Sequence, residues 1–564
     1  MISIAMRELV RRLAQHPLLT IEILGATFLI TVLTLAQPIY VIQLLNRYVT
    51  YGFHGTLITL TAGMLIAVLM QFCFRIIRTR MAMAINLEPN NILARDVLSI
   101  IAQAKSEHLG QVPRPKLQEA LAHVQTIQTV YDAQTLNQLI DVPFSLLFIA
   151  VLYLLSPLLA GICCLGILGA ILSGWMSLIK SGKTTDLLGK EMTAHRGATF
   201  AALHAQETVR AFGGIEFLFK NWDKQLHLIE ILRQKLTTTR EFSQTLGLTG
   251  NSVTSVAIYA VGAILVVQGD LTVGALIGAN ILSGRAYQTS TRLVQILLML
   301  KKAQAAFMDL SILRQFPREA SQGTALKSYT GLVEFKDLGF FFPNRANPVF
   351  KSLNLRLEPG SVLVVYGANG TGKTTLAKLL LCLLSPRRGA IQVDGVTLSQ
   401  IVPSWWRRQV IYMPQELDFL NGSFRENILL LNPELDDTRL NQILRITDLK
   451  PFLDQAPNGL ETPLLDNGRT IPLGIRRRLA LARALASDGQ LAVLDEPTDA
   501  MDQKGIDAVY DVMNSLAKAK KTIIVFSNDP KILKGATVIL NLNAKPIPER
   551  ITPAMIGKLE ELTP

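Results

Sequence analysis

Cysteine is scarce in this chain, and the few cysteines are badly placed for a disulfide framework. Only four occur in 564 residues, and Cys73, Cys163 and Cys164 lie within strongly hydrophobic stretches. Cys382 lies on a predicted helix, where packing of a small apolar side chain is the expected role. We therefore expect neither a disulfide framework nor a cysteine-based metal site.

Charged residues are also few, at 18%, against 49% hydrophobic residues. The chain is too long for one ordinary domain, and this composition is typical of a membrane protein. Stretches near the ~20 apolar residues that a bilayer requires all lie in the first part of the chain. The first stretch lacks a small-residue cleavage pattern and is longer than a signal-peptide core, so it should remain as a span. We predict six spans, at about residues 18–44, 55–77, 139–157, 158–180, 250–269 and 273–299.

Lys and Arg residues indicate the orientation. They precede the first predicted span, follow the last one, and populate the two long connections at 79–138 and 181–249, whereas the opposite loops carry little beyond Arg47 and Asp270. Because basic loops stay on the cytoplasmic side, both termini and both long connections are expected there. The net charge of +13 then reflects membrane topology, and nothing supports binding to nucleic acid.

The most informative motif follows the predicted spans. Residues 367–374 read Gly-Ala-Asn-Gly-Thr-Gly-Lys-Thr, preceded by an apolar run at 361–366 and followed by a helical pattern. A strand, this loop and a helix in register predict a phosphate-binding loop, which a chance glycine-rich turn would not produce. Backbone N–H groups and Lys373 would hold phosphate, and the Thr374 hydroxyl would bind Mg²⁺. The expected nucleotide-binding residues are Gly367, Asn369, Gly370, Gly372, Lys373, Thr374 and Thr375.

A polar linker at 321–324 separates the two parts, and short strands with soluble helices follow from Gly331. We expect an all-α membrane domain of six helices at 1–324 and an α/β P-loop nucleotide-binding domain at 325–564. The two long connections, of ~60 residues each, are long enough for an outgoing and a returning helix that extend ~40 Å into the cytoplasm. Their turn signals, at 110–115 and 211–214, fit either tips that contact the nucleotide-binding domain or solvated hairpin ends.

Asp141 and Pro143 open the third predicted span. An acidic residue at the cytoplasmic edge followed by proline is typical of a helix start. We interpret the pair in that way rather than as a substrate contact.

Six spans, long cytoplasmic helices and a P-loop domain together resemble the half-transporters of the ATP-binding cassette exporter family, over nearly the whole chain. Residues 491–497, Leu-Ala-Val-Leu-Asp-Glu-Pro, are similar to the family's Walker B strand. The resemblance implies that Asp495 holds Mg²⁺ through water and that Glu496 polarises the attacking water. Residues 412–415, Tyr-Met-Pro-Gln, resemble the loop whose glutamine, here Gln415, senses Mg²⁺ and the γ-phosphate.

Two further stretches resemble family loops. Residues 338–343 are similar to the adenine-stacking loop and imply that Phe342 lies against the base, although Phe340 and Phe341 leave the register open. Residues 499–502, Asp-Ala-Met-Asp, resemble the loop that crosses to the partner domain.

Within the family, residues 139–144 and 271–286 are most similar to the inner-membrane component of bacterial type I secretion systems. This resemblance implies a multi-pass protein of the bacterial inner membrane that uses ATP and Mg²⁺. It also implies a periplasmic adaptor, an outer-membrane channel and a secreted polypeptide as cargo. Because only about 17 residues precede the first span, no additional N-terminal cytoplasmic domain is expected. A lipid or small-molecule exporter would share every nucleotide-binding residue and stays an alternative.

The sequence departs from the family at two places. The signature Leu-Ser-Gly-Gly-Gln binds the γ-phosphate held by the opposite subunit, and here a hydroxyl, an N–H and an amide are missing from it. Asn528 replaces the switch histidine and keeps a hydrogen-bond donor without a titratable charge. The degenerate signature reads Ile471, Pro472, Leu473, Gly474 and Ile475.

The departures matter because each nucleotide site in the family joins the P-loop of one subunit to the signature of the other. In a homodimer both sites would combine Asn528 with a poor signature, and hydrolysis would be slow or absent. In a heterodimer with an intact partner, this chain's P-loop would meet a good signature. We favour the heterodimer. The alternative from another functional class is a regulatory subunit that binds ATP, barely hydrolyses it and leaves turnover to a partner.

Overall fold

The computed structural model describes residues 3–110, 112–324, 326–342 and 347–551. Contacts divide the chain into two units. The helical unit comprises residues 1–103 and 111–316, and the α/β unit comprises residues 104–110 and 317–564. Each unit is described by itself.

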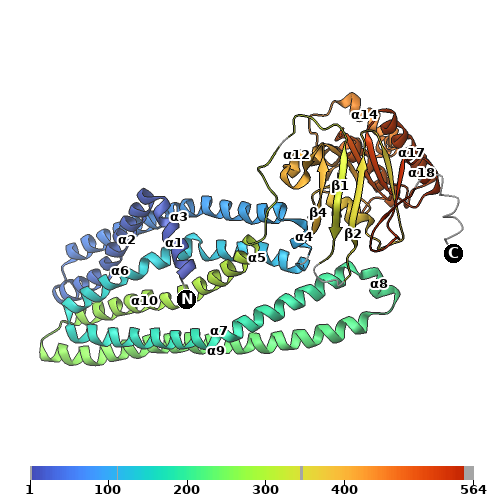
Figure 1. The fold of residues 1–564 in the computed structure, drawn as a ribbon. Helices are drawn as coiled ribbons and strands as arrows, with labels where there is room; N and C mark the ends of the chain where they lie inside the picture. The colour runs from blue at the N-terminus through green and yellow to red at the C-terminus, as the bar shows by residue number, and fades with distance from the viewer. Residues whose placement is uncertain (1–2, 111, 325, 343–346, 552–564) are drawn as a thin grey trace. The chain divides into compact units, whose positions relative to one another are not determined.

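The helical unit is built from long helices that lie alongside one another (Figure 1). Helices α7 and α9 pair along much of their length, as do α6 and α10, and α2 and α3. The helices are α1 (Ser3–Gln15), α2 (Pro17–Gln43), a π-helical turn (Leu44–Val49), α3 (His54–Gln103), α5 (Arg114–Val130), α6 (Ala133–Leu155), α7 (Pro157–His204), α8 (Gln206–Ala211), α9 (Ile215–Gln268) and α10 (Val273–Arg314).

Local sequence explains where several of these helices begin and end. Pro17 and Pro157 occupy first-turn positions, where the missing N–H costs nothing. The Thr272 side chain caps α10 by accepting a hydrogen bond from Ala275 N at 3.2 Å. Helix α9 ends at Gln268 and is followed by Gly269, whose φ of 85° favours glycine. The interruptions between α6 and α7 and between α9 and α10 therefore fall close to the predicted positions.

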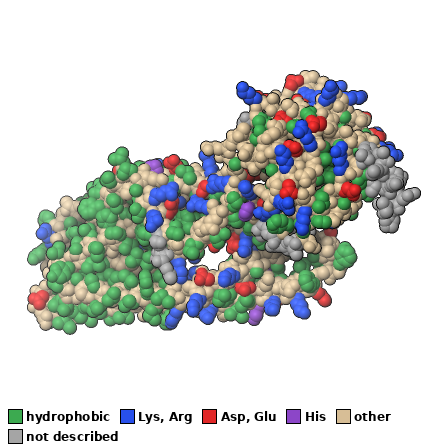
Figure 2. Space-filling model, in the orientation of Figure 1, with side chains coloured by type: hydrophobic (Ala, Val, Ile, Leu, Met, Phe, Trp, Pro, Cys, Tyr) green, Lys and Arg blue, Asp and Glu red, His purple; other side chains and the backbone are tan. Residues whose placement is uncertain are grey.

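Five described helices are long and apolar enough to cross a membrane: α2 with its π-helical turn, α3, α6, α7 and α9. The sixth predicted span, 273–299, lies on α10 but is not among the five, so a count of six stays a prediction. Large apolar side chains such as Ile58, Phe72 and Val267 are exposed on these helices. Figure 2 shows hydrophobic side chains covering one end of the long helices, with Lys and Arg gathered toward the other end. This distribution matches a bilayer with a basic cytoplasmic side.

The interpretation of Asp141 and Pro143 as a helix start is wrong. Helix α6 begins eight residues earlier, at Ala133, because the Asp132 side chain accepts a hydrogen bond from Thr135 N at 2.7 Å and caps it. Pro143 lies inside the helix. Asp141 therefore projects from the middle of a helix, where it forms an ion pair with Arg78.

The α/β unit contains two main sheets. The larger has the strand order β12-β11-β3-β10-β9-β6, and all of its strands are parallel except β12. The smaller has the order β2-β1-β4-β5 and is antiparallel. The strands are β1 (Val333–Phe340), β2 (Phe350–Leu357), β3 (Val362–Tyr366), β4 (Arg388–Val393), β5 (Val396–Thr397), β6 (Val410–Met413), β9 (Leu491–Asp495), β10 (Thr522–Phe526), β11 (Val538–Asn541) and β12 (Glu549–Ile551), with β7 (Gly422–Ser423) and β8 (Pro463–Leu464) as a separate pair.

Helices cover the parallel sheet and carry the motifs. Strands β3, β9 and β10 are almost entirely buried, as expected for a parallel sheet that is covered on both faces. The helices are α11 (Lys373–Leu380), α12 (Pro403–Arg408), α13 (Phe424–Ile428), α14 (Asp437–Ile446), α15 (Lys450–Gln455), α16 (Leu473–Leu485), α17 (Gln503–Lys518) and α18 (Pro530–Lys534), with short 3₁₀ turns at Leu398–Gln400, Gly459–Glu461 and Asp466–Gly468.

The tip of the first long connection belongs to the α/β unit. Helix α4 (Ser106–Leu109) follows Ala104, which forms a β-bridge with Arg318. Glu107 forms an ion pair with Arg387. Of the two readings of this tip, a contact with the α/β unit is therefore the one observed.

Candidate nucleotide-binding site

The predicted phosphate loop lies between β3 and α11, at the carboxyl end of the parallel sheet. Gly370 and Gly372 have φ values of 82° and 110°, which side chains rarely adopt. A Cβ atom at Gly372 would also lie 2.3 Å from Val349 Cγ1. These two glycines are thus required by the backbone path. Asn369 is exposed at the loop, and Thr375 is half-buried in the first turn of α11.

Lys373 is buried and already engaged. Its ammonium donates to Gly367 O at 2.7 Å and lies 2.7 Å from Glu496 Oε1. The two side chains are only 7% and 17% exposed, so solvent screens this ion pair weakly. The predicted phosphate-binding lysine and the predicted general base therefore neutralise each other in this structure.

Asp495 ends the central strand β9 and is fully buried. Neither carboxylate oxygen has a hydrogen-bond partner at ordinary geometry within the described residues. Burial raises the pKa of Asp495 to about 6, and the nearby negative charge of Glu496 acts in the same direction, whereas the Thr374 hydroxyl and the Lys373 ammonium lower it. A buried carboxylate with unpartnered oxygens is a group that a cation would stabilise.

Oxygen ligands converge beside Asp495. The Thr374 hydroxyl donates to Gln415 Oε1 at 3.1 Å, which brings the loop and the end of β6 together. Hydroxyl, amide and carboxylate oxygens suit Mg²⁺, which keeps several waters and takes few protein ligands. The described ranges contain no cluster of three or more His, Cys, Asp or Glu residues that could hold a metal ion.

Glu496 is fixed by its backbone. Its φ is 48°, its N–H donates to Phe526 O at 2.9 Å, and its own carbonyl accepts from Asp499 N. The buried Arg477 on α16 lies 3.5 Å from Glu496 O and 3.4 Å from Asp499 Oδ2. These contacts connect the Walker B strand, the loop at 499–502 and the helix that follows the degenerate signature.

Two asparagines hold the start of the phosphate loop. Asn528 Oδ1 accepts from Gly367 N at 3.2 Å, and Asn543 Oδ1 accepts from Ala368 N at 2.8 Å. In addition, Lys545 donates to Thr371 O at 2.7 Å. Sequence reasoning identified Asn528 as a phosphate donor and missed Asn543 and Lys545. They follow β11 without any motif, and only the sheet order β11-β3 brings them to the loop.

The three phenylalanines of the predicted adenine loop differ in exposure. Phe340 is buried in the core beneath the small sheet. Phe341 is 48% exposed, and Phe342 is half-buried with its ring edge-on to Phe340 at 5.0 Å. Phe341 and Phe342 therefore remain as the candidates for the residue that stacks on the base. Pro343, on which Phe342 was aligned, lies outside the described residues.

The degenerate signature forms the start of α16. Pro472 precedes the helix with φ −55° and ψ 145°, and no side chain caps the first turn. Pro472 and Leu473 are exposed, whereas Ile471 and Ile475 pack against a core cluster that includes Phe424 and Leu479. Within the described chain none of the five donates to the phosphate loop. The structure thus brings together Lys373, Thr374, Gln415, Asp495, Glu496 and Asn528, and places the signature residues elsewhere on the same unit.

Comparisons with known proteins agree with both units. A family model described as "ABC transporter transmembrane region" matches residues 20–289, and one described as "ABC transporter" matches residues 350–499. The toxin RTX-I translocation ATP-binding protein of Actinobacillus pleuropneumoniae is 26% identical over 552 residues, covering 96% of this chain and 76% of that protein. The leukotoxin export ATP-binding protein LtxB of Aggregatibacter actinomycetemcomitans is 25% identical over 557 residues, with the same coverage.

A solved structure shares the fold. The structure of a bacterial Atm1-family ABC exporter with ATP bound has a TM-score of 0.85 to this chain and covers 96% of it, with 97% of its own chain matched. Its sequence identity is 17%, so the likeness concerns the fold alone.

Proposed function

Because this chain belongs to the ATP-binding cassette transporters, as a multi-pass protein of the bacterial inner membrane with a cytoplasmic ATPase domain, we propose that it is the ATP-binding half of an exporter that secretes a polypeptide. The names of the similar toxin and leukotoxin proteins support a type I secretion system. A periplasmic adaptor and an outer-membrane channel are the partners this proposal requires. The membrane domain would span residues 1–324 and the nucleotide-binding domain residues 325–564.

The observation that carries the proposal is the convergence of Lys373, Thr374, Gln415 and Asp495 beside the intact Glu496. Lys373 and the loop N–H groups would bind the phosphates, and either Phe341 or Phe342 would stack on the base. Glu496 would act as general base once ATP releases it from Lys373. The remaining loop contacts would come from Gly367, Asn369, Gly370, Gly372, Thr374 and Thr375.

Mg²⁺ fits the oxygen set described above. Thr374, Gln415 and Asp495 would hold it, directly or through water, and the unpartnered oxygens of Asp495 support this assignment. When bound, the ion would neutralise phosphate charge that develops during hydrolysis. This chain's own contribution is to hold the Asp495 carboxylate in a buried position and to bring the Thr374 hydroxyl and the Gln415 amide oxygen together beside it.

The assembly we propose is a heterodimer with a second ABC half. Pro472 offers neither a hydroxyl nor an N–H, and the exposed Leu473 adds bulk where backbone should approach phosphate. A partner with an intact signature would complete the site on this chain's P-loop. A homodimer would leave both sites with a poor signature.

A second candidate function rests on the two departures from the family, the degenerate signature and Asn528. With Asn528 in place of the switch histidine, this chain would bind ATP, barely hydrolyse it and serve as a regulatory subunit that leaves turnover to its partner. The intact Glu496 and Gln415 favour residual catalysis by this chain. The two candidates differ in which subunit's glutamate is needed.

The test is affinity capture of the tagged chain from native membranes, followed by ATPase assays of the assembly that emerges. We expect a second ABC half to co-purify, and the assembly to hydrolyse ATP faster than this chain alone in lipid. Glu496→Gln in the assembly separates the two candidates, because it abolishes turnover only if this chain's site is catalytic. Recovery of this chain alone with brisk turnover would contradict the heterodimer. Stimulation by lipid or small molecules but not by unfolded polypeptide would favour the other class of exporter.

A further inference from the structure

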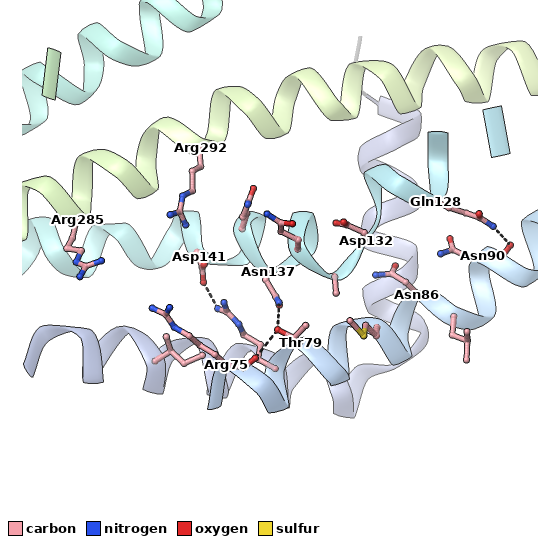
Figure 3. Close-up of a pocket in the computed structure, with 17 residues that line it drawn as sticks. Arg75, Thr79, Asn86, Asn90, Gln128, Asp132, Asn137, Asp141, Arg285 and Arg292 are labelled. Carbon is pink, nitrogen blue, oxygen red and sulfur yellow. Dashed lines mark hydrogen bonds and ion pairs between the residues drawn. The ribbon is translucent and has the colours of Figure 1, made fainter. Parts of the chain in front are cut away.

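The helical unit contains a polar cavity of about 830 Å³ that none of the nucleotide chemistry uses (Figure 3). Helices α2, α3, α5, α6 and α10 contribute to its lining. Only four of its lining residues, Ile30, Met83, Leu87 and Ala133, are apolar. A cavity of this size matches those that hold ligands in proteins, although its lining is unusually polar.

Arginines gather at one end of this cavity. Figure 3 shows Arg75 from α3, together with Arg285 and Arg292 from α10, around Asp141 of α6. With Arg78, four arginines face only two aspartates, which leaves a net charge of +2 on the lining. Like charges held together in this way repel one another unless an anion neutralises them.

The two aspartates are committed to other contacts. Asp141 Oδ1 lies 2.5 Å from Arg78 Nη1, and Asp132 caps helix α6. The guanidinium groups of Arg75 and Arg292 make no hydrogen bond or ion pair with the described residues, and that of Arg285 donates only to the neutral Gln37 Oε1 at 2.9 Å. Three guanidinium groups are therefore available to a ligand.

Membrane topology alone does not account for these arginines. Arg285 and Arg292 lie within the predicted span 273–299, where a charged side chain is unfavourable unless it has a partner or water. Arginines that serve only orientation face the headgroups at helix ends. These instead line a cavity that also contains six amide side chains and the Thr79 hydroxyl.

The opposite end of the cavity is rich in amide side chains. Figure 3 places Asn86, Asn90 and Gln128 there, with Asn137 between them and Asp141, and Gln134 and Gln138 are also in the lining. Asn137 is 6% exposed, and its Oδ1 atom has no hydrogen-bond partner among the described residues. Amides donate and accept, as peptide groups do, so this end suits an extended backbone and offers little to acyl chains.

A second cavity of about 480 Å³ shares Arg75 and Arg285 with the first. It continues between α2, α3 and α10 past Thr34, Gln37 and Gln71. The shared arginines thus stand where two polar cavities meet. A chain passing from one cavity to the other would pass these guanidinium groups.

We propose that this arginine-lined cavity binds the carboxylate side chains of an extended acidic segment of the exported polypeptide, an inference that rests on the proposed export function. Arg75, Arg285 and Arg292 form charge-assisted hydrogen bonds with those carboxylates. Asp141 competes with the cargo carboxylates, because its own carboxylate forms an ion pair with Arg78. The amide end holds the neighbouring peptide groups.

The test uses the full chain in nanodiscs of uncharged phosphatidylcholine, without ATP. A labelled unstructured peptide rich in Glu is compared with the same peptide carrying Gln at every Glu position, by fluorescence anisotropy. We expect the acidic peptide to bind at least about tenfold more tightly. Arg285→Gln and Arg292→Gln should each remove most of that preference, and Arg292→Lys should keep much of it because the charge remains.

Two further variants distinguish a binding role from a structural one. Arg80→Gln, on the same helix as Arg75 but outside the cavity lining, should leave the preference unchanged. Asp141→Asn should strengthen binding of the acidic peptide by several-fold, since it frees Arg78. A residue that only maintained the fold would not shift affinity in the favourable direction. Retained ATP binding serves as the check that each variant is folded.

The outcomes separate this inference from the proposed function. Equal binding of both peptides would overturn the carboxylate site and leave polypeptide export standing. Absence of binding by either peptide would count against polypeptide export itself. In a third outcome, phosphatidylglycerol displaces the acidic peptide, and the wild type retains this lipid whereas Arg292→Gln loses it. That result would assign the cavity to a lipid headgroup and overturn the proposal.

Discussion

The ion pair between Lys373 and Glu496 predicts that removing the carboxylate charge strengthens ATP binding. Glu496 Oε1 lies 2.7 Å from Lys373 Nζ, and both side chains are largely buried. ATP must separate them before Lys373 can bind phosphate. Glu496→Gln keeps the shape of the side chain and weakens the contact that ATP has to break. It also removes a negative charge that would repel the phosphates.

The size of the effect follows from the kind of contact. A hydrogen bond that involves a charged group contributes about 1.5–3 kcal/mol, and Lys373 stays charged in Glu496→Gln, so the ion pair lies at the upper end of this range and the remaining bond at the lower end. The difference of roughly 1.5 kcal/mol corresponds to about tenfold tighter binding. Lys373→Ala should have the opposite effect and nearly abolish binding, because the phosphates then lose their cation.

The assay is titration of the chain in lipid nanodiscs with a fluorescent ATP analogue in EDTA, so that neither Mg²⁺ nor hydrolysis contributes. Glu434→Gln is the matched control, since Glu434 is exposed on the same unit and lies far along the chain from the loop motifs. Affinity that is unchanged or weakened in Glu496→Gln would refute the view that this ion pair competes with ATP. With Mg²⁺ present, the same variant should hydrolyse ATP at least about 100-fold more slowly than the wild type.

Three more predictions concern the same unit. Asn528→Ala should weaken ATP binding by a few-fold, because Gly367 N loses its acceptor. Asn528→His should raise turnover of the assembled dimer. Equal affinity and turnover for the wild type and both variants would contradict a role for this position. The double variant Pro472→Ser with Leu473→Gly should increase turnover at the site that uses this signature by at least about tenfold, measured as phosphate release by the dimer, and no increase would show that the signature is not limiting. Without nucleotide, Asp495→Asn should raise the melting temperature relative to wild type at pH 7.5. The wild-type carboxyl has a folded pKa of about 6, above its unfolded value, so its ionisation disfavours the fold as pH rises from about 4 to 6; the advantage of Asp495→Asn should therefore shrink below pH 5, and a constant advantage would contradict the buried charge.

The strand, loop and helix around residues 367–374 form where the sequence predicts them, because their motif is local. The spacing of Gly370 and Gly372 before Lys373 identifies them in the sequence, since glycine readily adopts the positive φ values that the loop requires before a helix. Asp495 and Glu496 follow a run of apolar residues that can only be a buried strand. Asn543 and Lys545 were missed because their roles depend on β11 lying next to β3, which no local pattern specifies.

In the helical unit, by contrast, the sequence predicts helix boundaries and side-chain positions less well. Hydropathy located the third apolar stretch at 139–157, but the start of its helix was predicted at Asp141, because an acidic residue with a proline two positions later resembles a helix start. The true cap, Asp132, lies at the end of a polar stretch where hydropathy gives no signal. The cavity could not be predicted at all. It depends on residues near 75 and near 290 facing each other across helices, and hydropathy contains no information about helix rotation.

We expect the degenerate signature to weaken phosphate binding without eliminating it. The first-turn N–H groups of α16 at Leu473, Gly474 and Ile475 still lack intrahelical partners, as in any helix, and the helix dipole still favours an anion there. What Pro472 removes is one N–H and one hydroxyl, and what Leu473 adds is an exposed side chain beside the remaining donors. A γ-phosphate facing this end would therefore be held at lower affinity and in poorer alignment. Such a site would let ATP close the two nucleotide-binding domains while slowing its hydrolysis, so one nucleotide could persist through several turnovers of the other.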